Sequence, residues 1–128
     1  MHRNTLWIFG HRKCGTTLLT NLFDSHPKII NYGSDFRMIY AFHDHLQKLH
    51  GASRRRERFS TLFHDDRVSS DDINETTFRE VTSKLDFEND DVVWDYLKGV
   101  RASVDATKYL MVKETSSEMY FGSIREAV

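Results

Sequence analysis

The chain has 128 residues, of which 39% are hydrophobic and 29% charged, and this composition suits one globular domain. Its formal net charge of −1 excludes a generally basic protein that binds nucleic acid or an anionic membrane through overall charge, so any positive site must be local. No apolar stretch approaches the roughly 20 residues of a membrane span, and Cys14 has no partner for an intrachain disulfide. We therefore expect a cytoplasmic protein without a targeting segment.

The first predicted elements are a strand and a helix joined by a short loop. A continuous apolar run stops at Gly10, which predicts a buried strand over residues 5–10. A helix is predicted to begin at Thr16 or Thr17 and to end at Ser25-His26-Pro27. Its apolar face would consist of residues at helical spacing, namely Leu18, Leu19, Leu22 and Phe23.

The middle of the chain is predicted as a short strand, a helix and an irregular surface segment. The strand would start at Ile29-Ile30. Apolar residues then recur at steps of three or four over residues 36–50, which predicts a helix that Gly51 ends. Residues 51–72 are polar and charged and include the basic run Arg54–Arg58, so we interpret them mainly as a surface excursion.

The last third of the chain is predicted to contain three helices and a strand. One helix is predicted over residues 75–85. A second follows Asp90-Asp91, whose charges suit a helix N-terminus. Its apolar stripe comprises Val93, Tyr96, Leu97, Val100 and Val104. Tyr109–Val112 reads as a buried strand, and a final helix is predicted over residues 118–128.

Strands separated by helices predict an α/β fold, here a P-loop-like, three-layer arrangement in which helices flank a parallel sheet. Only two strands are strongly indicated and the chain stops inside a predicted helix, whereas parallel sheets usually have more strands. We therefore expect residues 1–128 to be the N-terminal portion of a single larger domain that is incomplete at its C-terminus. On its own, this portion would be poorly soluble or loosely folded.

The predicted loop between the first strand and helix reads GHRKCGTT over residues 10–17. Strand, glycine-containing loop and helix in this order place unpaired backbone N–H groups at a helix N-terminus, where the helix dipole favours an anion. Gly10 and Gly15 have the separation of the nucleotide-triphosphatase pattern G-x-x-x-x-G-K-[ST]. Thr16 stands where that pattern has its lysine, and the nearest lysine is Lys13. This difference argues against an ordinary ATPase, GTPase or nucleoside kinase.

Three segments together resemble one enzyme family. Arg12-Lys13-Cys14-Gly15-Thr16-Thr17-Leu18-Leu19 is close to the pattern P-[KR]-[SA]-G-T-T-x-L, with arginine in place of proline and cysteine in place of serine. The continuation Leu22–Pro27 is close to the helix ending L-L-x-x-H-P, and Tyr109–Thr115 is close to a strand that ends in K-T-P or K-D-P. These patterns are those of the sulfotransferases that use 3′-phosphoadenosine 5′-phosphosulfate (PAPS), and the chain resembles the N-terminal part of that domain.

The resemblance implies that PAPS is the cofactor and that an acceptor hydroxyl or amine receives its sulfuryl group. Lys13 would stabilise charge on the leaving phosphate, with Arg12 as a supporting charge, and Lys113 would approach the sulfate from the strand end. The 5′-phosphate would be held by backbone N–H groups and two threonine hydroxyls, within the set Cys14, Gly15, Thr16 and Thr17.

The general base that takes the acceptor's proton has more than one candidate. Asp35 follows the histidine-proline turn, as the base does in related enzymes that use a carboxylate. Asp35 or Ser34 could instead cap the helix predicted over residues 36–50. Other family members use a histidine, so His43 and His45 are further candidates. Their spacing does not suit a metal site, because residues i and i+2 do not face each other on a helix.

A second class of function remains open on the sequence alone. In the family, the 3′-phosphate is held by an arginine and a serine within R-D-P-R-x-x-x-x-S, and no such segment occurs before Val128. The chain by itself would then be nearly inactive. The alternative is a non-catalytic module that binds a nucleotide or another anion. Cys14 could also be a reactive thiol, because Lys13 and a helix start lower a thiol pKa.

Overall fold

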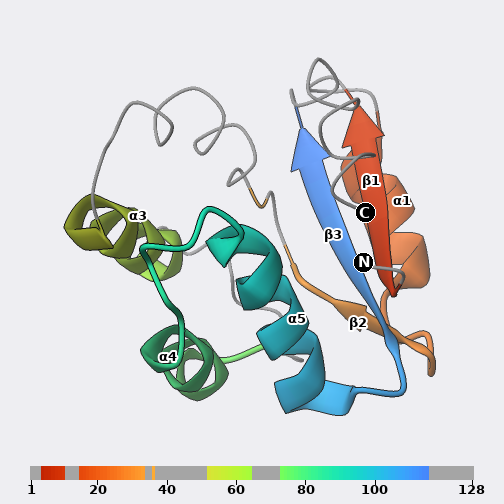
Figure 1. Ribbon diagram of the computed structural model, residues 1–128. Helices are drawn as coiled ribbons and strands as arrows, with labels where there is room; N and C mark the ends of the chain where they lie inside the picture. The colour runs from red at the N-terminus through yellow and green to blue at the C-terminus, as the bar shows by residue number, and fades with distance from the viewer. Residues whose placement is uncertain (1–3, 11–14, 34–35, 37–51, 65–72, 116–128) are drawn as a thin grey trace.

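The computed structural model describes residues 4–10, 15–33, 36, 52–64 and 73–115. Within these ranges the chain forms three strands and four helices (Figure 1). In chain order they are β1 (Thr5–Gly10), α1 (Thr16–Phe23), β2 (Ile29–Asn31), α3 (Ala52–His64), α4 (Glu75–Ser83), α5 (Val92–Asp105) and β3 (Tyr109–Thr115). No helix among the described residues is long and apolar enough to cross a membrane.

The three strands form a parallel sheet in the order β1-β3-β2. The register pairs Ile8 with Lys113 and Ile30 with Leu110, so β3 lies in the centre. This arrangement confirms the predicted mixed α/β class and the two strongly indicated strands. It also confirms the short strand at Ile29-Ile30, which extends to Asn31.

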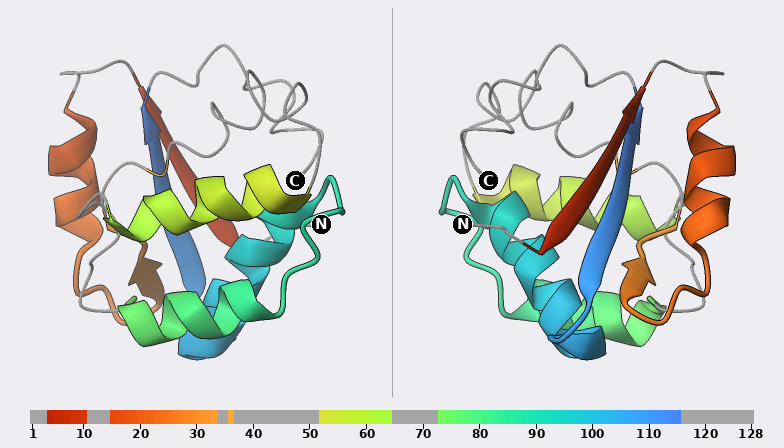
Figure 2. Two further views of the ribbon diagram at one scale, coloured as in Figure 1. Left: turned by 90° about the vertical axis from the view of Figure 1, so that its left-hand side faces the viewer. Right: turned by 90° about the vertical axis from the view of Figure 1, so that its right-hand side faces the viewer.

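Side chains of the sheet alternate between two faces, as the strand period of two requires. The face bearing Leu110 and Val112 belongs to the main apolar core, together with the buried stripe of α5. Figures 1 and 2 show α3, α4 and α5 on this side of the sheet and α1 on the other. The periodicity of α5 therefore predicted most of the buried face correctly, because Val93, Tyr96, Leu97 and Val100 are buried. Val104, also predicted, is only partly buried, and Val92 joins the buried residues without having been predicted.

Tyr96 is the centre of an aromatic cluster in this core. Its ring lies edge-to-face with those of Phe59 and Phe78, at centroid distances of 5.2 and 6.0 Å. Its hydroxyl lies 2.8 Å from that of Tyr32, and both side chains are fully buried. This pair connects the residue after β2 to α5 through a hydrogen bond between two buried hydroxyl groups.

The helix α1 forms where the sequence predicts it, but a different face is buried. Thr16 and Thr20 are the buried residues of the helix. Leu18 and Leu22 are 66% and 72% exposed, and Leu19 and Phe23 are also exposed. The predicted apolar face of α1 is therefore exposed, and the helix buries its threonine side instead.

The interpretation of residues 51–72 as mainly a surface excursion is wrong for its first half, where α3 forms. Arginine is a good helix former, so the basic run is compatible with a helix interior. Phe59 is 1% exposed and anchors the helix to the aromatic cluster. Arg55 adds a second anchor, because Nη1 donates to the carbonyl oxygen of Phe87 over 3.0 Å.

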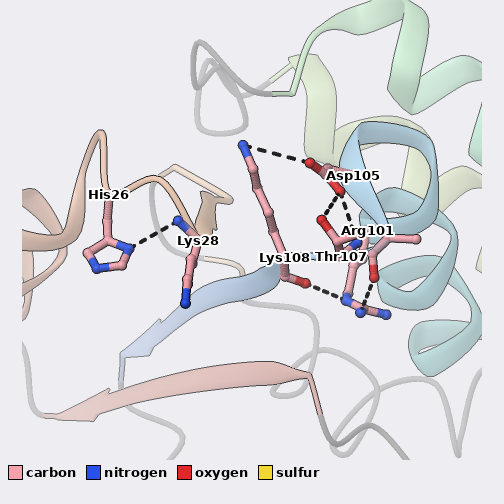
Figure 3. A network of polar contacts seen from close by, with 7 residues as sticks. His26, Lys28, Arg101, Asp105, Thr107 and Lys108 are labelled. Carbon is pink, nitrogen blue, oxygen red and sulfur yellow. Dashed lines mark hydrogen bonds and ion pairs between the residues drawn. The ribbon is translucent and has the colours of Figure 1, made fainter.

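The connection from α5 to β3 is fixed by polar contacts (Figure 3). Arg101 Nε donates to the carbonyl oxygen of Lys108 over 2.6 Å, and Nη2 donates to that of Ala106. Asp105 Oδ1 accepts hydrogen bonds from the hydroxyl and the backbone N–H of Thr107, at 2.6 and 2.9 Å, and these bonds lower the pKa of Asp105. The contacts hold the chain at the point where β3 enters the sheet.

The predicted helix over residues 75–85 is confirmed as α4, which ends two residues earlier. Its N-cap is Asn74, whose Oδ1 accepts from the backbone N–H of Thr77 over 2.9 Å. Of the helix predicted over residues 36–50, the structure describes only Phe36, and the helix predicted over residues 118–128 lies outside the described residues.

Candidate anion-binding site

The structure describes four of the ten residues considered for the predicted site. Gly15, Thr16, Thr17 and Lys113 are placed. The remaining predicted site residues lie outside the described ranges, namely Arg12, Lys13, Cys14, Asp35, His43 and His45. The geometry of the candidate site is therefore built from the end of β1, the first turn of α1 and the end of β3.

Gly15 precedes α1 in a backbone conformation that favours glycine. Its φ and ψ are 92° and 12°, in the left-handed region that other L-residues rarely adopt. A Cβ atom built on this residue would meet no atom within 4 Å. The backbone torsion, rather than crowding, accounts for the glycine, and the space beside the start of the helix is open.

The first turn of α1 offers backbone N–H groups to a ligand. The helix has no side-chain cap, and its first backbone hydrogen bond runs from Leu19 N–H to the carbonyl oxygen of Gly15 over 3.0 Å. The N–H groups of the preceding helical residues have no intrahelical acceptor, as at any helix start. Together with the helix dipole, they favour an anion at this position.

Lys113 brings a positive charge to the same turn. Its Nζ donates to Oγ1 of Thr17 over 3.0 Å, although the two residues are 96 positions apart. The lysine is only 7% exposed and lies at the carboxyl end of the central strand. In a parallel sheet this edge is where ligands bind, since the strands end there and the helices begin.

The end of β2 also approaches Lys113. The backbone N–H of Phe36 donates to the carbonyl oxygen of Lys113 over 2.8 Å, and the N–H of Tyr32 donates to that of Met111 over 3.0 Å. Gly33 lies between them with a φ of 107° and donates its N–H to Oδ1 of Asn31. Tyr32 and Phe36, which lie on either side of the predicted base Asp35 in the sequence, are therefore hydrogen-bonded to β3, the strand that carries Lys113.

Glu114 is a buried carboxylate on the opposite face of β3 from Lys113. It is fully buried, and its register partner in β1 is Phe9. Burial raises the pKa of Tyr32 well above its usual value, and the neighbouring Tyr96 and the charge of Glu114 raise it further. Burial likewise raises the pKa of Tyr96.

The sequence analysis did not identify Glu114 as a core residue. The available signal was strand alternation, because Glu114 shares a face with Leu110 and Val112 while Lys113 shares one with Met111. Lys113 therefore lies on the side of the sheet that faces α1, and Glu114 lies on the side that faces α5.

A helix N-terminus, a hydroxyl and a buried ammonium converge at the candidate site, and this combination suits a phosphate or sulfate group. Among the described residues, no group of three or more histidine, cysteine, aspartate or glutamate side chains could hold a metal ion. Comparisons of the chain with protein-family models, with curated proteins and with solved structures find no match.

Proposed function

We propose that this chain carries the phosphosulfate-binding part of a sulfotransferase, which transfers a sulfuryl group from PAPS to an acceptor hydroxyl or amine in a P-loop-like domain. The observation that supports this most is the 3.0 Å contact between Lys113 Nζ and Thr17 Oγ1. This contact joins, at one edge of the sheet, two segments that each resemble a family motif: the start of α1 and the end of β3. The proposal rests on this contact and on the sequence resemblance.

The burial of Lys113 favours an anionic ligand over a neutral one. Removing an ammonium group from water is costly unless nearby polar or negative groups compensate it. The Thr17 hydroxyl is one of the groups that contact it, and a phosphate oxygen at the first turn of α1 would add a negative charge beside the ammonium group. Binding of the donor would then use the lysine and the backbone N–H groups of residues 15–17 together.

The proposed reaction moves a sulfuryl group between two nucleophiles. A bond forms between the acceptor oxygen or nitrogen and sulfur, while the bond between sulfur and the bridging phosphate oxygen breaks and leaves its electron pair on that oxygen. Lys13 and Lys113 would stabilise the resulting negative charge. Asp35 would take the acceptor's proton, with His43 and His45 as the other candidate bases.

Lys113 also predicts how the site responds to divalent metal ions. In nucleotide triphosphatases, the serine or threonine at the position of Thr17 binds Mg²⁺. Here the Thr17 hydroxyl accepts a hydrogen bond from the lysine, so a protein cation already contacts the oxygen that would bind the metal. We expect donor binding to be unchanged by EDTA and not to increase with added Mg²⁺, as measured by calorimetric titration. A requirement for Mg²⁺ would contradict this role of Lys113.

The decisive experiment measures transfer of labelled sulfate from PAPS by the full-length protein that carries this sequence, over a panel of carbohydrate, phenol and peptide acceptors. We expect Lys13→Ala and Lys113→Met to abolish most of the transfer. Lys98→Met is the matched control, because Lys98 is an exposed lysine on α5. Unchanged transfer by both site variants would refute the proposal, whereas donor binding without transfer would favour the non-catalytic module.

A further inference from the structure

The basic run on α3 packs against the segment between α4 and α5. Arg55 is the inner residue of the run, with a side chain that is 14% exposed. It donates to the carbonyl oxygen of Phe87 and, over 2.7 Å, to Oδ1 of Asp90. Arg56 lies over the ring of Phe87, with its guanidinium carbon 4.9 Å from the ring centroid. The run is therefore part of a packed surface rather than a solvated loop.

A cavity of about 180 Å³ opens beside this surface, between α3, α4 and Phe87. Figure 2 shows the two helices on the same side of the sheet, whereas the candidate anion site lies at the ends of β1 and β3. Three buried phenylalanines and two arginines contribute to the lining: Phe59, Phe78, Phe87, Arg56 and Arg79. The rings of Phe59 and Phe87 meet edge-to-face at 5.4 Å. The cavity thus has aromatic walls and basic groups in one small volume.

The polar groups of the cavity favour a ligand that accepts hydrogen bonds. Its hydroxyl groups already donate to carbonyl oxygens of their own helices, as Thr82 does to Phe78 over 2.8 Å and Ser60 does to Glu57 over 2.6 Å. Arg79 is partly engaged, because its Nε donates to Oε1 of Glu75 over 2.9 Å. Arg56 has no hydrogen-bond or ion-pair partner among the described residues, so its N–H groups are the strongest donors left.

We propose that this cavity binds a small aromatic anion, with its ring against the phenylalanines and its carboxylate or sulfate group on Arg56. An apolar cavity of about 150 Å³ is large enough for benzene, so the volume here accommodates one ring with a small anionic substituent. The planar guanidinium of arginine binds two oxygens of a carboxylate or of a tetrahedral oxyanion through two N–H groups at once. The stacking on Phe87 holds the guanidinium in place before the ligand arrives.

The test is an NMR titration of the isotope-labelled full-length protein that carries this sequence, with benzoate and phenyl sulfate as the probes. Benzyl alcohol is the neutral control, because it keeps the ring and lacks the charge. Acetate is the second control, because it keeps the carboxylate and lacks the ring. We expect both anions to shift the amide signals of α3 and α4 and to bind at least about tenfold more tightly than either control.

Two variants assign the binding to the cavity. Arg56→Gln should weaken benzoate binding about tenfold, whereas Arg54→Gln, on the same helix but outside the cavity, should leave it unchanged. Any one of three results would overturn the proposal. The protein could bind benzoate and benzyl alcohol with equal affinity, the Arg56→Gln variant could bind benzoate as tightly as the wild type, or neither anion could bind at about 10 mM. None of these results bears on sulfate transfer, which uses the other site.

Discussion

Replacing Lys113 with methionine isolates the contribution of one ammonium group to the candidate anion site. Methionine keeps an unbranched side chain of similar length and removes the charge. The lost interaction is a charge-assisted hydrogen bond to an anion, which is worth about 1.5–3 kcal/mol. We therefore expect the dissociation constant for the anion to rise roughly 10- to 150-fold.

The same substitution should have little effect on the stability of the fold. Lys113 is 7% exposed, so the variant loses polar contacts that include the bond to the Thr17 hydroxyl but also avoids the cost of burying an ammonium group. We expect the free energy of unfolding, measured with urea, to fall by no more than about 1 kcal/mol. A large loss of stability would show that the lysine is a structural residue.

Adenosine 5′-phosphosulfate is the appropriate probe for the binding measurement, because it carries the phosphosulfate group and lacks the 3′-phosphate. Calorimetric titration of the wild type, Lys113→Met and the exposed-lysine control Lys98→Met compares the three affinities. An unchanged affinity in Lys113→Met would refute the reasoning. An equal loss in Lys98→Met would show that the effect comes from net charge rather than from the site.

Three further substitutions test the start of α1 at the site and the packing of the core on the other side of the sheet. Gly15→Ala should lower the free energy of unfolding by about 1–2 kcal/mol, because φ is 92° and no neighbour compensates the strain; an unchanged urea midpoint would contradict this. Gly99→Ala should destabilise the chain by about 1–3 kcal/mol, since a Cβ there would lie 2.7 Å from Val81 Cγ1, and the loss should disappear in a Val81→Ala background. Tyr96→Phe should cost about 1–3 kcal/mol by leaving the buried hydroxyl of Tyr32 without this partner, and the double variant with Tyr32→Phe should cost less than the sum of the single changes.

Most of the described elements follow from local sequence patterns. The apolar run before Gly10 predicted β1, and the stripe that includes Tyr96 predicted both α5 and its buried face. These predictions succeed because burial on one face imposes a period of 3.6 on helices, and a strand covered on both faces reads as a continuous apolar run. Such patterns depend only on residues that are close together in the sequence.

The exceptions are segments whose packing depends on distant residues. The helix α3 was not predicted, because the first half of its sequence is mostly charged. Most of its described contacts come from the buried ring of Phe59 and from the long side chains of Arg55 and Arg56. The leucines of α1 indicated a buried face that this chain does not bury. A helical period shows that a helix has an apolar side, but not which partner covers it.

At the candidate site, too, local patterns were predicted correctly and a contact between distant residues was not. The motif around Gly15 predicted a helix start suited to an anion, and the structure places a left-handed glycine and an uncapped helix there. The approach of Lys113 to Thr17 was not predicted, because it depends on the register that pairs Ile8 with the lysine across the sheet. The resemblance to the family assigned both residues to one site, but it did not predict that their side chains are in contact.

The most direct test of the account is an NMR titration of the isotope-labelled chain with adenosine 5′-phosphosulfate, followed at individual backbone amides. We predict that the amide signals of residues 15–17 and of Lys113 shift together with one dissociation constant, and that they no longer shift in Lys113→Met. The absence of shifts at the start of α1, or shifts only in other parts of the chain, would contradict the central claim that an anion binds between this helix and the end of β3.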